Sequence, residues 1–221
     1  MSRVWTRSDP LEAEPETKLR VYSGSMLPLR IEDYDFFYSR FQIPTWALAT
    51  GGMIQRSPLG HYLLSIYGPN GLKRGVVARI PWKGAPLWNG IPPGPKADTF
   101  RSAWGPVQSH YRGSHEVGPL VLVEDQLSAI KLEAHGYDSV ALLGTPADVV
   151  GTYGGSDRVA EIATRARTHD EVIVALDADA TTEAFLFVRK WGSAFRQIRV
   201  AILSKDLKDT PPEQFEEVLG A

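Results

Sequence analysis

Acidic side chains follow two short apolar runs in the second half of the chain, at positions where strands would end. Glu124 closes the run Pro-Leu-Val-Leu-Val-Glu, and Asp177 and Asp179 close the run Val-Ile-Val-Ala-Leu-Asp-Ala-Asp. Such runs, rich in β-branched residues and followed by helix-compatible sequence, predict parallel strands of one sheet. Because open α/β sheets hold their chemistry at the carboxyl ends of their strands, we expect these acids to lie along one edge.

Carboxylates gathered at such an edge suit hard divalent cations, which take oxygen ligands. Asp206, which follows a further apolar run, is another candidate ligand beside Asp177 and Asp179. We therefore expect a site for Mg²⁺ or Mn²⁺. Glu124, on a neighbouring strand, can hold metal or act as a general base.

Each of these acids also has a purely structural interpretation. An aspartate at a strand-to-helix turn is often a helix N-cap, which applies to Asp177, Asp179 and, with Glu124, to Asp125. The charges that follow the last apolar run can be ordinary solvated loop charges, with the lysines present for solubility: Lys205, Asp206, Lys208 and Asp209.

The second half of the chain alternates strand and helix signals. Its sequence predicts strands over 119–124, 139–143, 171–177 and 197–203, and helices over 125–135, 156–168 and 180–195. The last helix carries an apolar stripe of Ala184, Phe187, Val188 and Trp191. This alternation predicts a parallel sheet with helices on both faces.

The first half is organised differently. Residues 20–116 show short strands and loops, among them a hairpin whose turn contains Pro69, Asn70 and Gly71. We therefore predict an α/β fold with a polar flexible tail over 1–18, a smaller mixed α+β subdomain over 19–116 that is basic and rich in aromatics, and the α/β subdomain over 117–221.

Charge is divided unevenly between the two halves. Residues 1–116 carry 14 Lys/Arg against 9 Asp/Glu, whereas residues 117–221 carry 10 against 17, giving −2 for the chain. The first half also holds 15 of the 22 aromatic residues, and positive charge beside aromatic rings is typical of single-strand binders. The aromatics fit a protein core equally well.

Several classes of protein are excluded by what the sequence lacks. There is no cysteine, hence no disulfide and no Cys-based zinc site. No apolar run is long enough to cross a bilayer, no Walker A motif is present, and without an amino-terminal hydrophobic segment we expect a cytoplasmic protein.

The ordered motifs of the second half resemble the Toprim domain of bacterial and phage primases. Glu124-Asp-Gln-Leu-Ser-Ala129 is similar to the primase run Glu-Gly-x-x-(Ser/Asp)-Ala, and Ser204-Lys-Asp-Leu-Lys-Asp209 is similar to Lys-Asp-x-x-(Asp/Glu). The hairpin with Val77-Ala-Arg79, and Pro95-Lys96, resemble the basic subdomain that precedes Toprim. Asp125 and Ala180 depart from the pattern, because many members have Gly at the first position and an acid or Gly at the second.

This resemblance implies a primase catalytic core that makes short RNA primers from ribonucleoside triphosphates on a single-stranded DNA template. Glu124, Asp177 and Asp179 would be catalytic, with Asp206 among the metal ligands. The residues expected to contact nucleic acid or nucleotide are Lys73, Arg74, Arg79, Lys96 and Lys205. The chain shows neither a zinc module nor a helicase domain, so a phage-type split primase, served by a separate helicase or template-recognition protein, is the expected form.

Two alternatives remain open. A Toprim nuclease would use the same acids for hydrolysis without nucleotides. A non-catalytic nucleic-acid-binding replication module would need only the fold, and it would gain nothing from repelling carboxylates.

Overall fold

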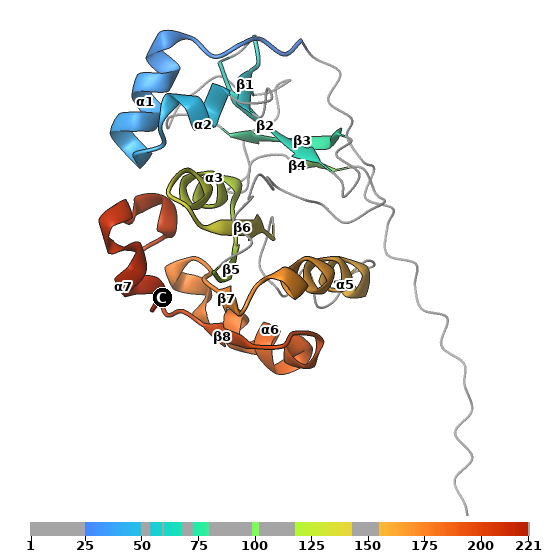
Figure 1. The fold of residues 1–221 in the computed structure, drawn as a ribbon. Coiled ribbons are helices and arrows are strands. Elements are labelled where there is room, and N and C mark those ends of the chain that lie inside the picture. The colour runs from blue at the N-terminus through green and yellow to red at the C-terminus, as the bar shows by residue number, and fades with distance from the viewer. Residues whose placement is uncertain are drawn as a thin grey trace, which may run out of the picture.

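The computed structural model describes residues 25–49, 54–58, 60–67, 73–79, 99–101, 118–142 and 155–220. These residues form two four-stranded sheets, one antiparallel and one parallel, with helices packed against them (Figure 1). The parallel sheet carries the candidate site, and the antiparallel sheet belongs to the part of the chain that precedes it. The tail predicted over 1–18 lies outside the described residues.

The parallel sheet has the strand order β6-β5-β7-β8. Its strands are β5 (Leu120–Val123), β6 (Asp138–Ala141), β7 (Val172–Val174) and β8 (Ile198–Val200). Leu120 pairs with Asp138 on one side and with Val172 on the other. The α/β fold predicted from the alternation of strands and helices is confirmed, although β7 and β8 are each shorter than the apolar runs that predicted them.

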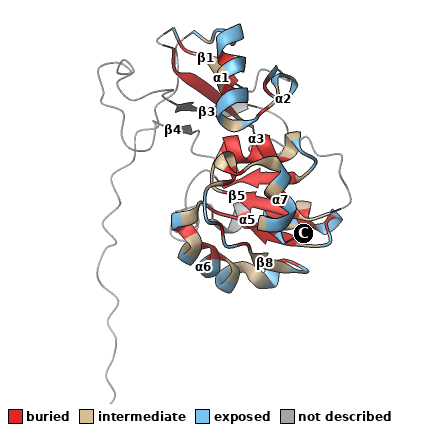
Figure 2. Cartoon of the chain, turned by 90° about the vertical axis from the view of Figure 1, so that its left-hand side faces the viewer, coloured by how far each residue is buried: buried red, intermediate tan, exposed pale blue. Residues whose placement is uncertain are grey.

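Alternate residues of β5 face opposite sides of this sheet. Val121 and Val123 join a core with helices α3 (Gln126–Ala134) and α7 (Phe215–Leu219). Leu120 and Leu122 join a second core with α5 (Gly155–Arg165) and α6 (Thr181–Trp191). This period of two is the pattern of a strand buried on both faces. β5, β6 and β7 are buried along their whole length, whereas β8 is only partly buried (Figure 2).

The helices that follow the two central strands lie on opposite faces of the sheet. Helix α3 follows β5 and packs on the face of Val121, whereas α6 follows β7 and packs on the face of Leu120. Neighbouring strands whose connections leave to opposite sides form a topological switch point, where open α/β sheets bind their ligands. The carboxyl ends of β5 and β7 therefore mark the expected position of a site.

Helix α6 shows the predicted apolar stripe. Ala184 and Phe187 are buried, and Val188 and Trp191 pack against the same core. The short 3-10 helix η4 (Gly192–Ala194) continues from its end. The helix predicted over 125–135 is likewise present as α3, with Gly136 at a φ of 91° just beyond it, a backbone conformation that glycine adopts without strain.

The antiparallel sheet has the strand order β1-β2-β3-β4. Its strands are β1 (Ile54–Arg56), β2 (Tyr62–Tyr67), β3 (Lys73–Arg79) and β4 (Thr99–Arg101). β2 and β3 pair as the predicted hairpin, with Tyr62 opposite Arg79. The predicted turn at Pro69, Asn70 and Gly71 lies outside the described residues.

The sequence signals over 20–116 locate strands and loops, and the mixed α+β part predicted there also contains two helices that those signals do not locate: α1 (Ile31–Phe41) and α2 (Thr45–Ala49). The start of α1 lacks the usual signal, since Arg30 stands at the N-cap and offers no side-chain acceptor to the helix. Instead the Asp33 carboxylate accepts the backbone N–H of Arg30 at 2.7 Å. Asp33 also accepts from the Tyr62 hydroxyl at 3.0 Å, which ties the helix to β2.

Helix α3 is shared by two cores. Ala129 and Leu132 face the parallel sheet, whereas Leu127 and Ile130 join the core formed by α1, α2, β1 and β2. The Gln126 side-chain amide donates to the Ser65 carbonyl of β2 at 2.9 Å. The two sheets are therefore joined through this helix, which lies between them (Figure 1). Among the described residues, no helix has the length and apolar character needed to cross a membrane.

Candidate active site

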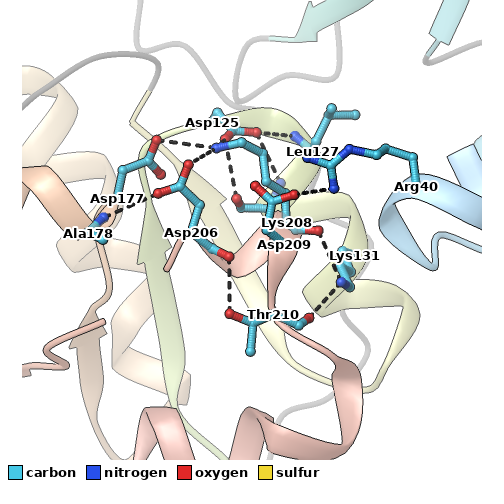
Figure 3. A network of polar contacts seen from close by, with 11 residues as sticks. Arg40, Asp125, Leu127, Lys131, Asp177, Ala178, Asp206, Lys208, Asp209 and Thr210 are labelled. Atoms are coloured by element: carbon cyan, nitrogen blue, oxygen red, sulfur yellow. Dashed lines mark hydrogen bonds and ion pairs between the residues drawn. The ribbon is translucent and has the colours of Figure 1, made fainter. Parts of the chain in front are cut away.

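Asp125 is the first residue of the site along the chain, and it is the N-cap of α3. Its Oδ1 accepts the backbone N–H groups of Leu127 at 2.7 Å and Ser128 at 3.1 Å. The capping interpretation offered by the sequence is thus confirmed for Asp125. The second carboxylate oxygen, Oδ2, remains directed to the site and accepts from Lys208 at 2.9 Å (Figure 3).

Asp177 follows β7, next to β5 in the sheet. It stands at the N-cap position of the short helix η3 (Ala178–Ala180), yet its side chain caps no backbone N–H. Its Oδ2 instead accepts from Lys208 at 3.3 Å. Burial raises the pKa of Asp177 to about 6; the Lys208 ammonium opposes this shift, and the Asp125 and Asp206 carboxylates add to it.

Asp206 comes from the segment after β8 and precedes η5 (Leu207–Asp209). Its Oδ1 accepts the backbone N–H of Ala178 at 3.3 Å, and its Oδ2 accepts from Lys208 at 2.6 Å. The Thr210 hydroxyl donates to the Asp206 carbonyl at 3.1 Å, which closes the turn behind it. Asp206 therefore links the segments after β7 and β8, and it is not simply a solvated loop charge.

Lys208 lies where these three segments meet. Its ammonium donates to Asp125, Asp177 and Asp206, and its side chain is only 12% exposed. Burial alone would lower the pKa of Lys208, but the Asp125 carboxylate and the hydrogen bonds to Asp206 and Asp125 outweigh burial and raise it above its ordinary value. We call Asp125, Asp177, Asp206 and Lys208 the acid–lysine cluster. The expectation that Lys208 is a solubilising surface lysine is wrong.

The segment that carries Lys208 is held from behind by α3. The buried Lys131 ammonium donates to the carbonyls of Lys208 at 3.1 Å and Thr210 at 2.6 Å (Figure 3). Burial lowers the pKa of Lys131 to about 8, although Asp209 and Glu213 raise it in part. Arg40 of α1 pairs with Asp209 at 2.6 Å, so the first part of the chain also contacts this segment.

The acid–lysine cluster does not fit a divalent metal ion in this arrangement. Within the described ranges, no three His, Asp or Glu side chains are grouped so that they could hold one. The carboxylates of Asp125, Asp177 and Asp206 surround an ammonium group, and two of them also accept backbone N–H groups with their other oxygen. The geometry is that of an ion-pair network around Lys208.

The other predicted site residues have different surroundings. Glu124 is partly buried directly after β5, whereas Asp179 in η3 and Lys205 are exposed. Lys73, Arg74 and Arg79 lie on β3, whose backbone is described. Lys96 lies outside the described residues. The structure thus brings Asp177 and Asp206 into one cluster and leaves Asp179 exposed to solvent.

Sequence reasoning missed Asp125 and Lys208 as members of the site. Asp125 takes the place of a glycine in the resembling motif, so the sequence suggests only a capping role for it. Lys208 occupies a variable position of the Lys-Asp-x-x-Asp run. Their opposite charges could have indicated them. Asp125 and Lys208 follow strands of the same parallel sheet, whose carboxyl ends lie along one edge, so an acid and a lysine at these positions can meet there.

Comparison with known proteins identifies this architecture. No family model and no curated protein matches the sequence. Among solved structures, the primase fragment of the bacteriophage T7 primase-helicase superposes with a TM-score of 0.56 at 16% identity, over 90% of this chain and 77% of that one.

A second match comes from a structure of the T7 lagging-strand DNA polymerase interacting with primase domains that are bound to an RNA/DNA hybrid and dTTP. It has a TM-score of 0.53 at 16% identity and covers 90% of this chain and 92% of the other. Both matches extend over the antiparallel and parallel sheets together, since they cover nine tenths of the chain. The chain therefore has the fold of a primase domain.

Proposed function

We propose that this chain is the catalytic core of a DNA primase, which makes short RNA primers on single-stranded DNA by nucleotidyl transfer. One observation carries the proposal: the acid–lysine cluster lies at the carboxyl ends of β5, β7 and β8, around the switch point of a primase-like fold. The Toprim interpretation of residues 117–221 is part of this proposal, and so is the division of the chain at about 116.

In this proposal the residues at the carboxyl edge of the parallel sheet have different roles. Glu124 is the candidate general base toward the attacking hydroxyl, because it follows the central strand β5 directly. Asp177 and Asp179 follow the neighbouring strand and orient the reacting groups. The exposed Lys205 supplies positive charge, which a triphosphate requires as its charge redistributes during transfer, whereas Lys208 is engaged by three carboxylates.

Nucleic-acid contacts are assigned to the first half. Lys73, Arg74 and Arg79 on β3, with Lys96, are the proposed contacts to template or nucleotide. The T7 primase domains are bound to an RNA/DNA hybrid and dTTP and interact with a DNA polymerase. For this chain we propose as partners a DNA template, ribonucleoside triphosphates, and a separate helicase or template-recognition protein.

A requirement for Mg²⁺ or Mn²⁺ also belongs to the proposal. Such ions neutralise triphosphates in phosphoryl transfer. Of the ligands expected from the sequence, Glu124 and Asp179 lie outside the acid–lysine cluster and are the proposed ones, whereas Asp177 and Asp206 accept from Lys208. In its present arrangement the acid–lysine cluster fits an ammonium. The roles assigned above to the protein side chains therefore do not depend on a metal ion bound in the cluster. Primer synthesis should stop when EDTA is added and return with excess Mg²⁺.

The test is primer synthesis by the purified protein on single-stranded DNA with labelled ribonucleotides and Mg²⁺ or Mn²⁺. Asp177→Asn keeps the shape of the side chain and removes its charge, and we expect it to lower product by at least about a hundredfold, as removal of a key electrostatic group does. Asp170→Asn is the matched control, because Asp170 is exposed near the opposite end of β7 and should leave activity unchanged.

The products separate the alternatives. Short RNA ladders from the wild type and the control, absent with Asp177→Asn, establish a primase core. Shortened template without a ladder indicates a nuclease. Neither product, with single-strand binding intact, indicates a replication module without catalysis or a required partner protein.

A further inference from the structure

The ammonium of Lys208 is fully engaged in the acid–lysine cluster. An ammonium has three N–H donors, and Lys208 directs them to three carboxylate oxygens: Asp206 Oδ2 at 2.6 Å, Asp125 Oδ2 at 2.9 Å and Asp177 Oδ2 at 3.3 Å. Each carboxylate comes from a different strand end, so one cation holds the segments after β5, β7 and β8 together.

Lys208 is also fixed at its backbone. Its carbonyl accepts from the buried Lys131 ammonium at 3.1 Å, so both ends of the residue are anchored. Its side chain is 12% exposed, whereas the neighbouring Lys205 is exposed to solvent. A side chain held in this way is a structural member of the site and does not behave as a mobile surface charge.

We infer that Lys208 takes the place of a divalent metal ion between Asp125, Asp177 and Asp206, so that this cluster assembles without metal and binds none while Lys208 is present. A metal ion needs the same oxygens at short distances and must displace the ammonium to reach them. Displacement would leave Lys208 partly buried without its partners, which is strongly unfavourable.

The inference concerns ion binding and stability, and it does not depend on primer synthesis. A metal that arrives with the nucleotide, and is held there by Glu124 and Asp179, is compatible with it. Failure of the proposed function would leave the results below unchanged. A metal found at the acid–lysine cluster would overturn the inference and leave the proposed function in place.

The test compares Lys208→Met with Lys205→Met. Thermal unfolding of each protein is followed with EDTA and with millimolar Mg²⁺ or Mn²⁺, and Mn²⁺ binding is measured by electron paramagnetic resonance. We expect Lys208→Met to lower Tm in EDTA, because the carboxylates then repel, and to regain several degrees when metal is added. Wild type and Lys205→Met should show no such metal-dependent rise.

Two further variants keep the test decisive if Lys208→Met fails to fold. Lys208→Arg retains a cation and should gain no metal-dependent rise in Tm. In the wild-type background, Asp206→Asn should leave any Mn²⁺ binding unchanged. The inference is overturned if wild-type protein binds Mn²⁺ and Asp206→Asn abolishes that binding, or if Lys208→Met and wild type respond equally to metal.

Discussion

Titratable side chains meet at both ends of the parallel sheet, and the two contacts are built differently. At the amino end, His169 pairs with Asp138 at 3.4 Å, with side chains only 2% and 1% exposed. The other ring nitrogen of His169 lies 3.1 Å from the Gly118 carbonyl. At the carboxyl end, three carboxylates with exposures of 21, 22 and 28% surround one lysine.

The difference separates a structural contact from a candidate for chemistry. The amino-end pair matches one acid with one ring in a closed interior, where its role is to fix the starts of β5, β6 and β7. The carboxyl-end cluster has more acid than base and retains contact with water. A substrate can reach a cluster that solvent reaches, and the raised pKa of Asp177 is typical of functional sites, so chemistry is expected at the carboxyl end.

The largest effect on stability is expected at the amino end. His169→Ala removes the ring that lies 3.4 Å from the buried Asp138 carboxylate, and losing this buried polar contact, together with the cavity left by the ring, costs about 3 kcal/mol or more. Urea denaturation measures the free energy of unfolding, with the exposed Asp170→Ala as control, for which a change within about 0.5 kcal/mol is expected. If His169→Ala lowered the free energy of unfolding no more than the control does, the amino end would not be the more strongly stabilised end of the sheet.

At the carboxyl end, Asp125→Ala should cost less. It removes the N-cap of α3 and one acceptor of Lys208, and loss of a cap costs about 1 to 2 kcal/mol. Asp125→Ser restores a cap without the charge and should recover most of that stability. Chemical denaturation of both variants separates the two roles. Equal losses would show that the ion pair, and not the cap, stabilises this end.

The Lys131 ammonium, which holds the site from behind, should give a pH signature. Its pKa in the folded chain is about 8 against an ordinary value of 10.5, so between these values the unfolded chain binds more protons. Stability contributed by this group therefore rises with pH in that range, by at most about 1 kcal/mol per unit.

The measurement is the free energy of unfolding of the wild type and Lys131→Met at pH 8 and pH 9.5. The wild type should gain stability relative to the variant as pH rises. This range also stays below the ordinary pKa of Tyr62, whose pKa burial and the Asp33 carboxylate raise further. Parallel profiles for the two proteins would contradict the assignment of the shift to Lys131.

The smallest effect is expected at the rim of the cluster. Arg40 pairs with Asp209 with side chains 55% and 29% exposed, and exposed pairs contribute about 0.5 kcal/mol or less. Arg40→Ala should therefore change Tm little, and thermal unfolding in low and high salt should show equally small differences. If Arg40→Ala lowered stability as much as Asp125→Ala, the Arg40–Asp209 pair would have to be counted with the acid–lysine cluster.

The α/β half of the fold was predictable because its signals are local. The strand runs, the apolar stripe of α6 and Gly136 after α3 each follow from a few adjacent residues. Helix α1 was not predicted, because Arg30 replaces the usual N-cap and the stabilising contact is made by Asp33, which also reaches Tyr62 from a distant strand.

The site was predictable only in part, for the same physical reason. The order of strands places Glu124, Asp177 and Asp206 along one edge, which the sequence indicates. The role of Lys208 depends on three strand ends converging on a single ammonium, and no local pattern reports such a contact. Asp177 also departs from what its local sequence predicts. It stands at an N-cap position, but its side chain accepts from Lys208 and caps no backbone N–H.

Helix α3 has a consequence for how the molecule can be divided. Its residues Leu127 and Ile130 complete the core of the first part, while Ala129 and Leu132 complete that of the second. A fragment that starts at residue 117 would carry Leu127 and Ile130 into water as an apolar patch, and the remaining fragment would lack a wall of its core. The two parts should therefore melt in one cooperative transition, and the fragments 1–117 and 118–221, produced together, should associate.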